Sequence, residues 1–131
     1  MTVPGHRYRL GALIVDCAVA DLDAAARFWA AALGYAAEPG DGRAEDRYRI
    51  LRGRPGSLPV EVQAVSGGSG LHVDIETDDV MAELDRLERL GARRLRAVRD
   101  WWVMEAPTGH RFCVVPLLPA DRHPGCPLCG R

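Results

Sequence analysis

The chain has 131 residues, of which 47% are hydrophobic and 27% charged, and its formal net charge is −1. This length suits one globular domain with a substantial core, and the near-neutral charge gives no electrostatic reason to expect nucleic acid as a partner. No apolar run approaches the roughly 20 residues that cross a bilayer, and residues 1–7 lack the apolar core of a secretory signal. We therefore expect a cytoplasmic protein that binds neither nucleic acid nor membrane.

All 17 basic residues are arginine. The lack of lysine excludes a Schiff-base enzyme and a P-loop nucleotide site. Together with abundant alanine, glycine and proline, it is typical of a GC-rich bacterial genome.

The first half of the chain predicts one strand, one helix and three short strands after a lead-in over residues 1–9. Residues 10–19 are almost wholly apolar and indicate a buried strand. Asp21 suits the N-cap of a helix whose apolar residues recur at helical spacing, and Gly34 suits its C-terminal end. Turn-rich segments then separate three predicted strands, at residues 35–38, 47–52 and 58–65.

The second half repeats this order of elements. A glycine-rich segment at residues 66–70 precedes it, and we interpret this segment as a hinge, because no helix follows to cradle a phosphate. Residues 71–77 form the next predicted strand, and Asp78 or Asp79 caps the second helix. Further strands are expected near residues 93–98, 101–105 and 111–117. Such self-similarity argues for two copies of one unit.

Three segments resemble the vicinal oxygen chelate superfamily, which includes glyoxalase I, bleomycin-resistance proteins and extradiol dioxygenases. They are residues 22–35, with Phe28-Trp29 and Leu33-Gly34-Tyr35, residues 72–80 and residues 102–115. The resemblance implies an α+β fold in which two βαβββ modules form a cup with the helices outside. We place the modules at residues 10–66 and 70–118 of a domain spanning 10–118, and a tail at 119–131. Members are often dimers and some exchange modules, so a homodimer is expected.

Strand alternation sorts the side chains onto two faces of such a cup. If the apolar sets pack under the helices, the polar sets line the cup. On the first, fifth and eighth strands these are Asp16, His72, Asp74, Arg111 and Cys113, and on the fourth strand Glu61, Gln63 and Val65 join them.

The resemblance also implies where a metal would bind. Metal-dependent members carry ligands on the first, fourth, fifth and eighth strands, and the matching positions here are Ile14, Gln63, His72 and Cys113. Isoleucine cannot ligate, Gln63 is a weak neutral ligand, and a His/Gln/Cys set is unusual. Asp16 offers the best substitute for Ile14. We therefore disfavour a divalent metal and expect no cofactor.

His72 remains the residue with the most chemistry. Beside Asp16 or Asp74 it could act as an oriented general base, or it could simply bond across the cup and shape a pocket. Trp101 and Trp102 point to opposite faces of their strand, so one should face the cup. We take Trp102, with Tyr48, as a candidate contact for a flat ligand.

The tail holds His123, Cys126 and Cys129, which have the spacing of half a zinc site. We interpret it as a dispensable end, because no second ligand pair is evident.

The favoured function is binding of a small hydrophobic or aromatic molecule in the cup without a catalytic metal, for sequestration or resistance. Whether the protein is an enzyme stays open. One alternative is an enzyme of the same superfamily, either a metal-dependent lyase or dioxygenase or a metal-free isomerase or lyase using His72 with Asp16 or Asp74. A weaker alternative is a scaffold protein whose tail recruits zinc or a partner.

Overall fold

One eight-stranded sheet and two helices make up the computed structural model, which describes residues 5–38 and 47–117. The tail residues His123, Cys126 and Cys129 lie outside this range. The first module contains β1 (Tyr8–Cys17), α1 (Leu22–Leu33), β2 (Ala36–Ala37), β3 (Tyr48–Arg52) and β4 (Val60–Ala64). The second contains β5 (Gly70–Thr77), α2 (Val80–Arg89), β6 (Arg93–Val98), β7 (Trp101–Glu105) and β8 (Arg111–Pro116).

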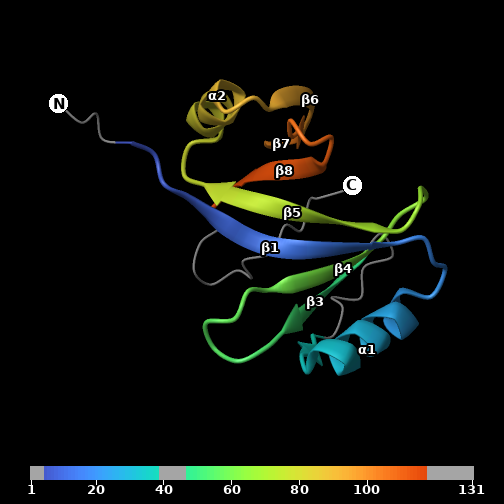
Figure 1. Ribbon diagram of the computed structural model, residues 1–131. Helices are drawn as coiled ribbons and strands as arrows, with labels where there is room; N and C mark the ends of the chain where they lie inside the picture. Colours follow the sequence, from blue (N-terminus) through green and yellow to red (C-terminus); the bar gives the residue numbers. More distant parts are fainter. Residues whose placement is uncertain (1–4, 39–46, 118–131) are drawn as a thin grey trace.

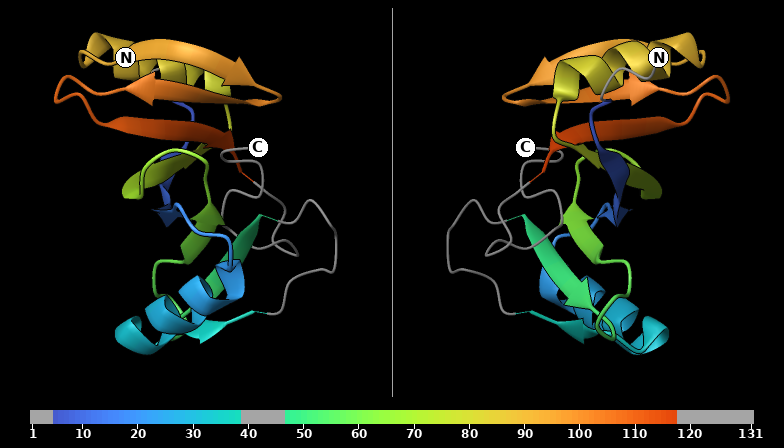
Figure 2. Two further views of the ribbon diagram at one scale, coloured as in Figure 1. Left: turned by 90° about the vertical axis from the view of Figure 1, so that its right-hand side faces the viewer. Right: turned by 90° about the vertical axis from the view of Figure 1, so that its left-hand side faces the viewer.

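The strand order confirms the predicted pair of βαβββ modules. The sheet runs β2-β3-β4-β1-β5-β8-β7-β6, so each module occupies one half of it (Figure 1). Within the modules β1 is parallel to β4 and β5 is parallel to β8, while β1 and β5 pair antiparallel and join the halves. The sheet curls into a cup with both helices on its outer side (Figure 2).

The helices begin and end where the sequence predicts. Asp21 caps α1, its carboxylate accepting a hydrogen bond from the backbone N–H of Ala24, and Gly34 adopts the left-handed conformation at the other end. Of the two aspartates considered for α2, Asp79 is the cap, because it accepts from the N–H of Ala82. No helix among residues 5–38 and 47–117 is long and apolar enough to cross a bilayer.

Each helix covers an apolar core on the outer face of the sheet. Under α1, Val15 and Cys17 pack with Val60 and Val62, and under α2 the cluster includes Met104, Phe112 and Val114, with Val73 and Ile75 beside it. Strand alternation predicted that one apolar set on each of β1, β5 and β8 would pack under the helices, and these sets do so. The polar sets on the same strands therefore face the inside of the cup.

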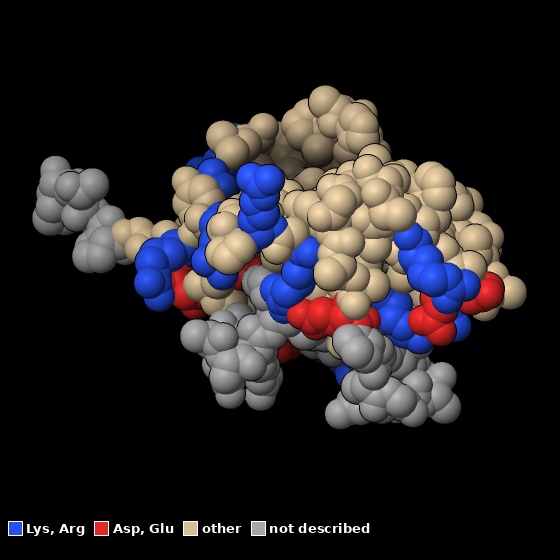
Figure 3. Space-filling view, turned by 90° about the horizontal axis from the view of Figure 1, so that it is seen from below, with Lys and Arg blue, Asp and Glu red and all other residues tan. Residues whose placement is uncertain are grey.

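The outer side of α1 also carries exposed apolar side chains, Phe28 and Leu33 among them. Figure 3 views the molecule from the side on which α1 lies in Figure 1, and much of this surface has no charged side chain. The expected homodimer stays a prediction. Here β1 and β5 of a single chain pair, so one chain builds the whole cup.

One position in β1 requires glycine, because β1 and a side chain of β5 approach each other closely there. The register of this pair shifts between Leu10 and Ala12, and the side chain of Glu76 crosses over Gly11 between them. A Cβ at Gly11 would lie 2.4 Å from Cγ of Glu76. Glu76 is 1% exposed, and Arg9 binds its Oε2 at 3.0 Å. Burial raises the pKa of Glu76, although Arg9 opposes the shift.

Substitution Gly11→Ala should therefore destabilise the junction between the modules. We expect a loss of about 1–3 kcal/mol in the free energy of unfolding, because a buried side chain must be displaced. Denaturant unfolding followed by circular dichroism measures this loss. Gly67→Ala is the matched control, since a Cβ there meets nothing within 4 Å. Equal stability of the two variants would contradict the packing argument.

Candidate functional site

A cavity of about 720 Å³ opens on the inside of the cup. The four central strands of the sheet, β4, β1, β5 and β8, contribute side chains to it. Six of the residues expected to line the cup do border this cavity, namely Asp16, Gln63, Val65, His72, Arg111 and Cys113. The loop between β4 and β5 adds Ser66, Gly67 and Gly68.

The centre of the site is a chain of hydrogen bonds across three strands. Nδ1 of His72 lies 2.6 Å from Oδ2 of Asp16, and Nε2 of Gln63 donates to Oδ1 of the same carboxylate at 3.1 Å. Strand register explains the contact. His72 is opposite Ile14 and Asp16 is opposite Gly70, so the carboxylate reaches diagonally to the imidazole over a residue without a side chain. Of the two proposed carboxylate partners, Asp16 makes the shorter contact.

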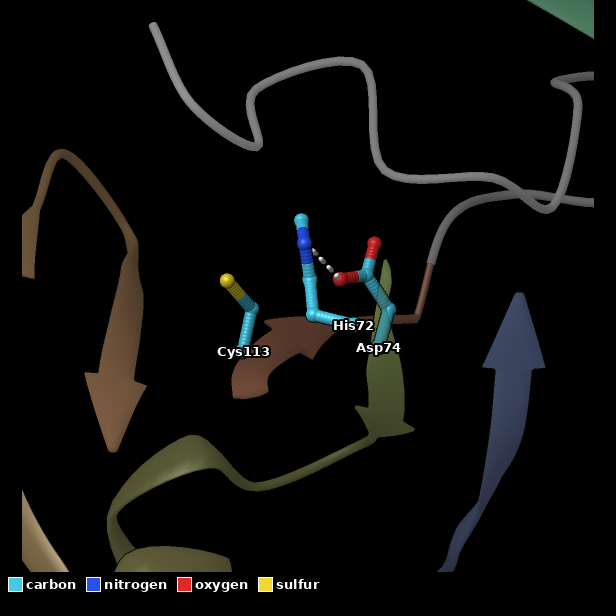
Figure 4. A group of neighbouring side chains, drawn as sticks. All are labelled: His72, Asp74 and Cys113. Carbon is cyan, nitrogen blue, oxygen red and sulfur yellow. Dashed lines mark ion pairs between the residues drawn. The ribbon is translucent and has the colours of Figure 1, made fainter. Parts of the chain in front are cut away.

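A second carboxylate lies on the other side of the imidazole. Oδ1 of Asp74 is 3.6 Å from Nε2 of His72, and Asp74 is 1% exposed. Asp74 is the register partner of Cys113 on β8. Figure 4 shows the three side chains of His72, Asp74 and Cys113 on the same side of the sheet.

These neighbours decide the charge of His72. Burial by itself would lower its pKa, but hydrogen bonds to Asp16 and Cys113, reinforced by their negative charge, raise the pKa to about 10. His72 is therefore an imidazolium at neutral pH. In that state it can donate a proton or attract an anion, but it cannot act as the general base considered from the sequence.

Trp102 is not in the cup, contrary to its selection from the sequence. It packs beside the apolar cluster under α2, and the guanidinium of Arg94 lies 5.8 Å from its ring centroid. Trp101 is the indole on the inner face, where it is 1% exposed and packs with Val103 and Cys113. The reason is alternation along β7, because Trp102 shares its face with the core residue Met104.

Tyr48 and Glu61 complete the inner face of the first module. Tyr48 is the register partner of Gln63, so it lies on the same face, but it does not border the cavity. Glu61 is opposite Ile14 and is 1% exposed. The ligand-binding roles proposed for these inner-face residues stay predictions.

Arg47 and Arg96 border the cavity and were missed from the sequence. Arg47 directly precedes β3. Arg96 was missed because the register of β6 against β7 shifts between Arg94 and Arg96. Simple alternation would have placed Arg94 and Arg96 on the same face, whereas the irregularity turns Arg96 to the inside. No pattern in the sequence marks that irregularity.

The described residues do not reproduce the superfamily's four-strand metal arrangement. Ile14 is 0% exposed and has no ligating atom, and Gln63, whose Nε2 donates to Asp16, offers only a neutral amide oxygen. His72, Asp74 and Cys113 instead form a different group, in which one ligand atom from each lies within 4.8 Å of the others. Nitrogen, oxygen and sulfur donors together suit zinc. An ion would first have to displace the proton from Nε2 of His72.

Comparison with known proteins gives a family match over most of the chain. A family model described as a glyoxalase-like domain matches residues 12–115. No protein of curated function matches significantly.

Among solved structures, the chain is similar to a hypothetical protein from Bacillus halodurans, with 10% identity, a TM-score of 0.63, and coverage of 88% of this chain and 98% of that one. It is also similar to a mutant 4-hydroxymandelate synthase from Streptomyces coelicolor, with 24% identity, a TM-score of 0.58, and coverage of 87% and 39%. Methylmalonyl-CoA epimerase from Mycobacterium tuberculosis has 21% identity, a TM-score of 0.52, and coverage of 91% and 94%. At these identities the likeness establishes the fold alone.

The charge of His72 can be tested by nuclear magnetic resonance. The Cε1 proton shift of His72 should stay constant between pH 6 and 8 and move only as the pH approaches about 10. The Asp16→Asn variant should titrate at a lower pH, because the neutral amide no longer stabilises the imidazolium. A wild-type midpoint near the ordinary value of 6.5 would contradict this description.

The same shift has a consequence for stability. Folding raises the pKa of His72, so protonated His72 stabilises the folded state. This stabilisation is fully present below about pH 6.5 and is lost as the pH rises through about 10. The difference in unfolding free energy between wild type and His72→Gln should therefore shrink over that range. A stability difference between wild type and His72→Gln that grows with pH would contradict this prediction.

Proposed function

We propose that this chain, which belongs to the glyoxalase-like domain family, binds a small hydrophobic or aromatic molecule in its cup without a catalytic metal, as a sequestering or resistance-type protein. The observation that carries this proposal is the cavity itself. Its volume of about 720 Å³ lies within the range of small-molecule sites, roughly 300–1,000 Å³. Such sites combine apolar walls with a few fixed polar groups.

The cavity has this combination. Val65 and Val103 supply apolar surface, and the hydrogen-bonded chain of Gln63, Asp16 and His72 supplies fixed polar groups. Because these polar groups hold one another in place, they need little reordering when a ligand enters. This preorganisation supports a binding role.

The protonation of His72 and the hydrogen bonds of Asp16 favour ligand binding over abstraction of a proton from a substrate. His72 is an imidazolium, and the Asp16 carboxylate already accepts hydrogen bonds from His72 and Gln63. A general base needs an available lone pair at the reacting atom. The metal-free isomerase or lyase is therefore the less favoured alternative for this pair.

Binding can be measured with the neutral aromatic probe N-phenyl-1-naphthylamine, whose fluorescence rises in apolar surroundings. The wild type should bind one probe per chain. Val65→Glu should weaken that affinity about threefold to tenfold, because it removes apolar wall surface and adds a charge. Val65 borders the cavity and is only half-buried after the end of β4, so its replacement should not disturb the core.

Leu90→Glu is the matched control, because Leu90 is 65% exposed but lies at the end of α2, away from the cavity. Circular dichroism should show that both variants remain folded. A wild type that does not bind the probe, or two variants that bind it equally well, would count against the cup as the binding site.

A metal-dependent enzyme is the second candidate, and the group of His72, Asp74 and Cys113 is the observation that favours it. A divalent ion held by these residues would act as a Lewis acid on a substrate oxygen. The epimerase and the synthase named above are enzymes on the same fold. Fold likeness alone does not transfer their activity to this chain.

Cobalt titration separates the two candidates. The protein should carry Cys126→Ser and Cys129→Ser, so that the cysteine pair of the tail cannot contribute. The favoured proposal predicts no stoichiometric binding and no thiolate–cobalt absorption. The second candidate predicts one ion per chain, lost in Cys113→Ala and kept in Cys17→Ala, whose thiol lies in the core under α1.

A further inference from the structure

We infer that the ligand of the cup carries an anionic group, a carboxylate, phosphate or sulfonate, which the guanidinium groups of Arg96 and Arg111 bind at the wall of the cavity. This inference rests on the proposed binding function and adds the chemical class of the ligand. It begins with an uneven distribution of ion pairs over the arginines of the chain.

Arginines outside the cavity are mostly neutralised by carboxylates. Seven of them form salt bridges within the described part of the chain, namely Arg7, Arg9, Arg49, Arg52, Arg86, Arg93 and Arg94. The three that border the cavity, Arg47, Arg96 and Arg111, have no carboxylate partner within residues 5–38 and 47–117. Arg27, Arg54, Arg89 and Arg99 likewise have no salt bridge among the described residues, but only at the cavity do three such arginines border one site within the described part of the chain.

Two carboxylates on the inner face of the sheet are already engaged. Glu105 is the register partner of Arg111, but its carboxylate binds Arg93 at 2.9 Å. Asp16 is held by His72 and Gln63 at the floor of the cavity. An anionic ligand group would therefore not have to displace an existing partner from Arg111.

Strand geometry places Arg96 and Arg111 on the same wall. Val103 of β7 is the register partner of both Arg96 on β6 and Cys113 on β8, and Arg111 is two residues before Cys113 on the same face. The two arginines are thus two strands apart and offset by two residues along the strands, roughly 12 Å between backbones at ordinary strand geometry. Side chains of this length can converge on one group from that separation.

The chemistry of the two side chains suits an anion with several oxygens. Guanidinium presents a planar set of donors that matches carboxylate, sulfonate and phosphate oxygens. Val103 lies between the two arginines in the register and borders the cavity, so the apolar part of a ligand can rest there. Arg47 offers a further cation from the first module, where its guanidinium donates to the carbonyl oxygen of Ala64 at 3.4 Å.

Two probes that differ by one sulfonate test the inference. 8-Anilinonaphthalene-1-sulfonate is N-phenyl-1-naphthylamine with an added sulfonate, so comparison of their affinities isolates the anionic group. Arg96→Gln and Arg111→Gln should each weaken sulfonate-probe binding about threefold, and the double variant about tenfold. Binding of the neutral probe should change less than twofold. Added salt should weaken only the sulfonate probe.

Arg27→Gln on the exposed side of α1 is the control for loss of one positive charge. If the neutral probe binds and the arginine variants leave the sulfonate probe unaffected, or weaken both probes equally, the inference is overturned while the binding function stands. If neither probe binds the wild type, the binding function fails first.

Discussion

The antiparallel pairing of β1 with β5 is the constraint on which the rest of the structure depends. It joins two modules that each pair their own first and fourth strands in parallel. The same register places Ile14 opposite His72 and Asp16 opposite Gly70. A shift by one residue would turn every polar side chain of one strand toward the helices. The strand pairing that joins the two modules therefore also positions the polar residues at the bottom of the cup.

Two parts of the cavity differ in charge. We call the group of Asp16, His72 and Asp74 the floor, and the side that carries Arg96 and Arg111 the wall. At the floor, the charge of His72 is balanced by Asp16, with Asp74 on the other side of the ring. Such a group orients polar atoms, but with two carboxylates to one imidazolium it does not itself attract an anion. At the wall, Arg96 and Arg111 keep their charge uncompensated among the described residues. The floor thus supplies geometry, and the wall supplies attraction for an anion.

Local signals made most of the fold predictable from the sequence. Asp21 and Gly34 mark the ends of α1 because capping depends on neighbouring residues alone. Alternation along β1 and β5 separated the core residues from those of the cup, since both strands have one apolar set. The internal repeat identified the two modules before any tertiary contact was known.

The site was predictable only in part, because it depends on register between strands. Asp16 and Asp74 were both reasonable partners for His72, and the diagonal over Gly70 distinguishes them. Trp102 was misplaced because two adjacent tryptophans give alternation no apolar preference. The His72, Asp74 and Cys113 group was not foreseen either, since its third member comes from the pairing of β5 with β8.

The irregularity in β6 gives the cup a means of changing its selectivity during evolution. β6 is the edge strand of the sheet, and its register shift alone turns Arg96 inward. If Leu95 instead paired with Val103, alternation along β6 would be simple and the guanidinium of Arg96 would turn to the helix side, while β1, β5 and β8 kept their packing. Descendants of one stable scaffold could thus acquire walls of different charge through changes of register at an edge strand, where sheets tolerate irregularities best.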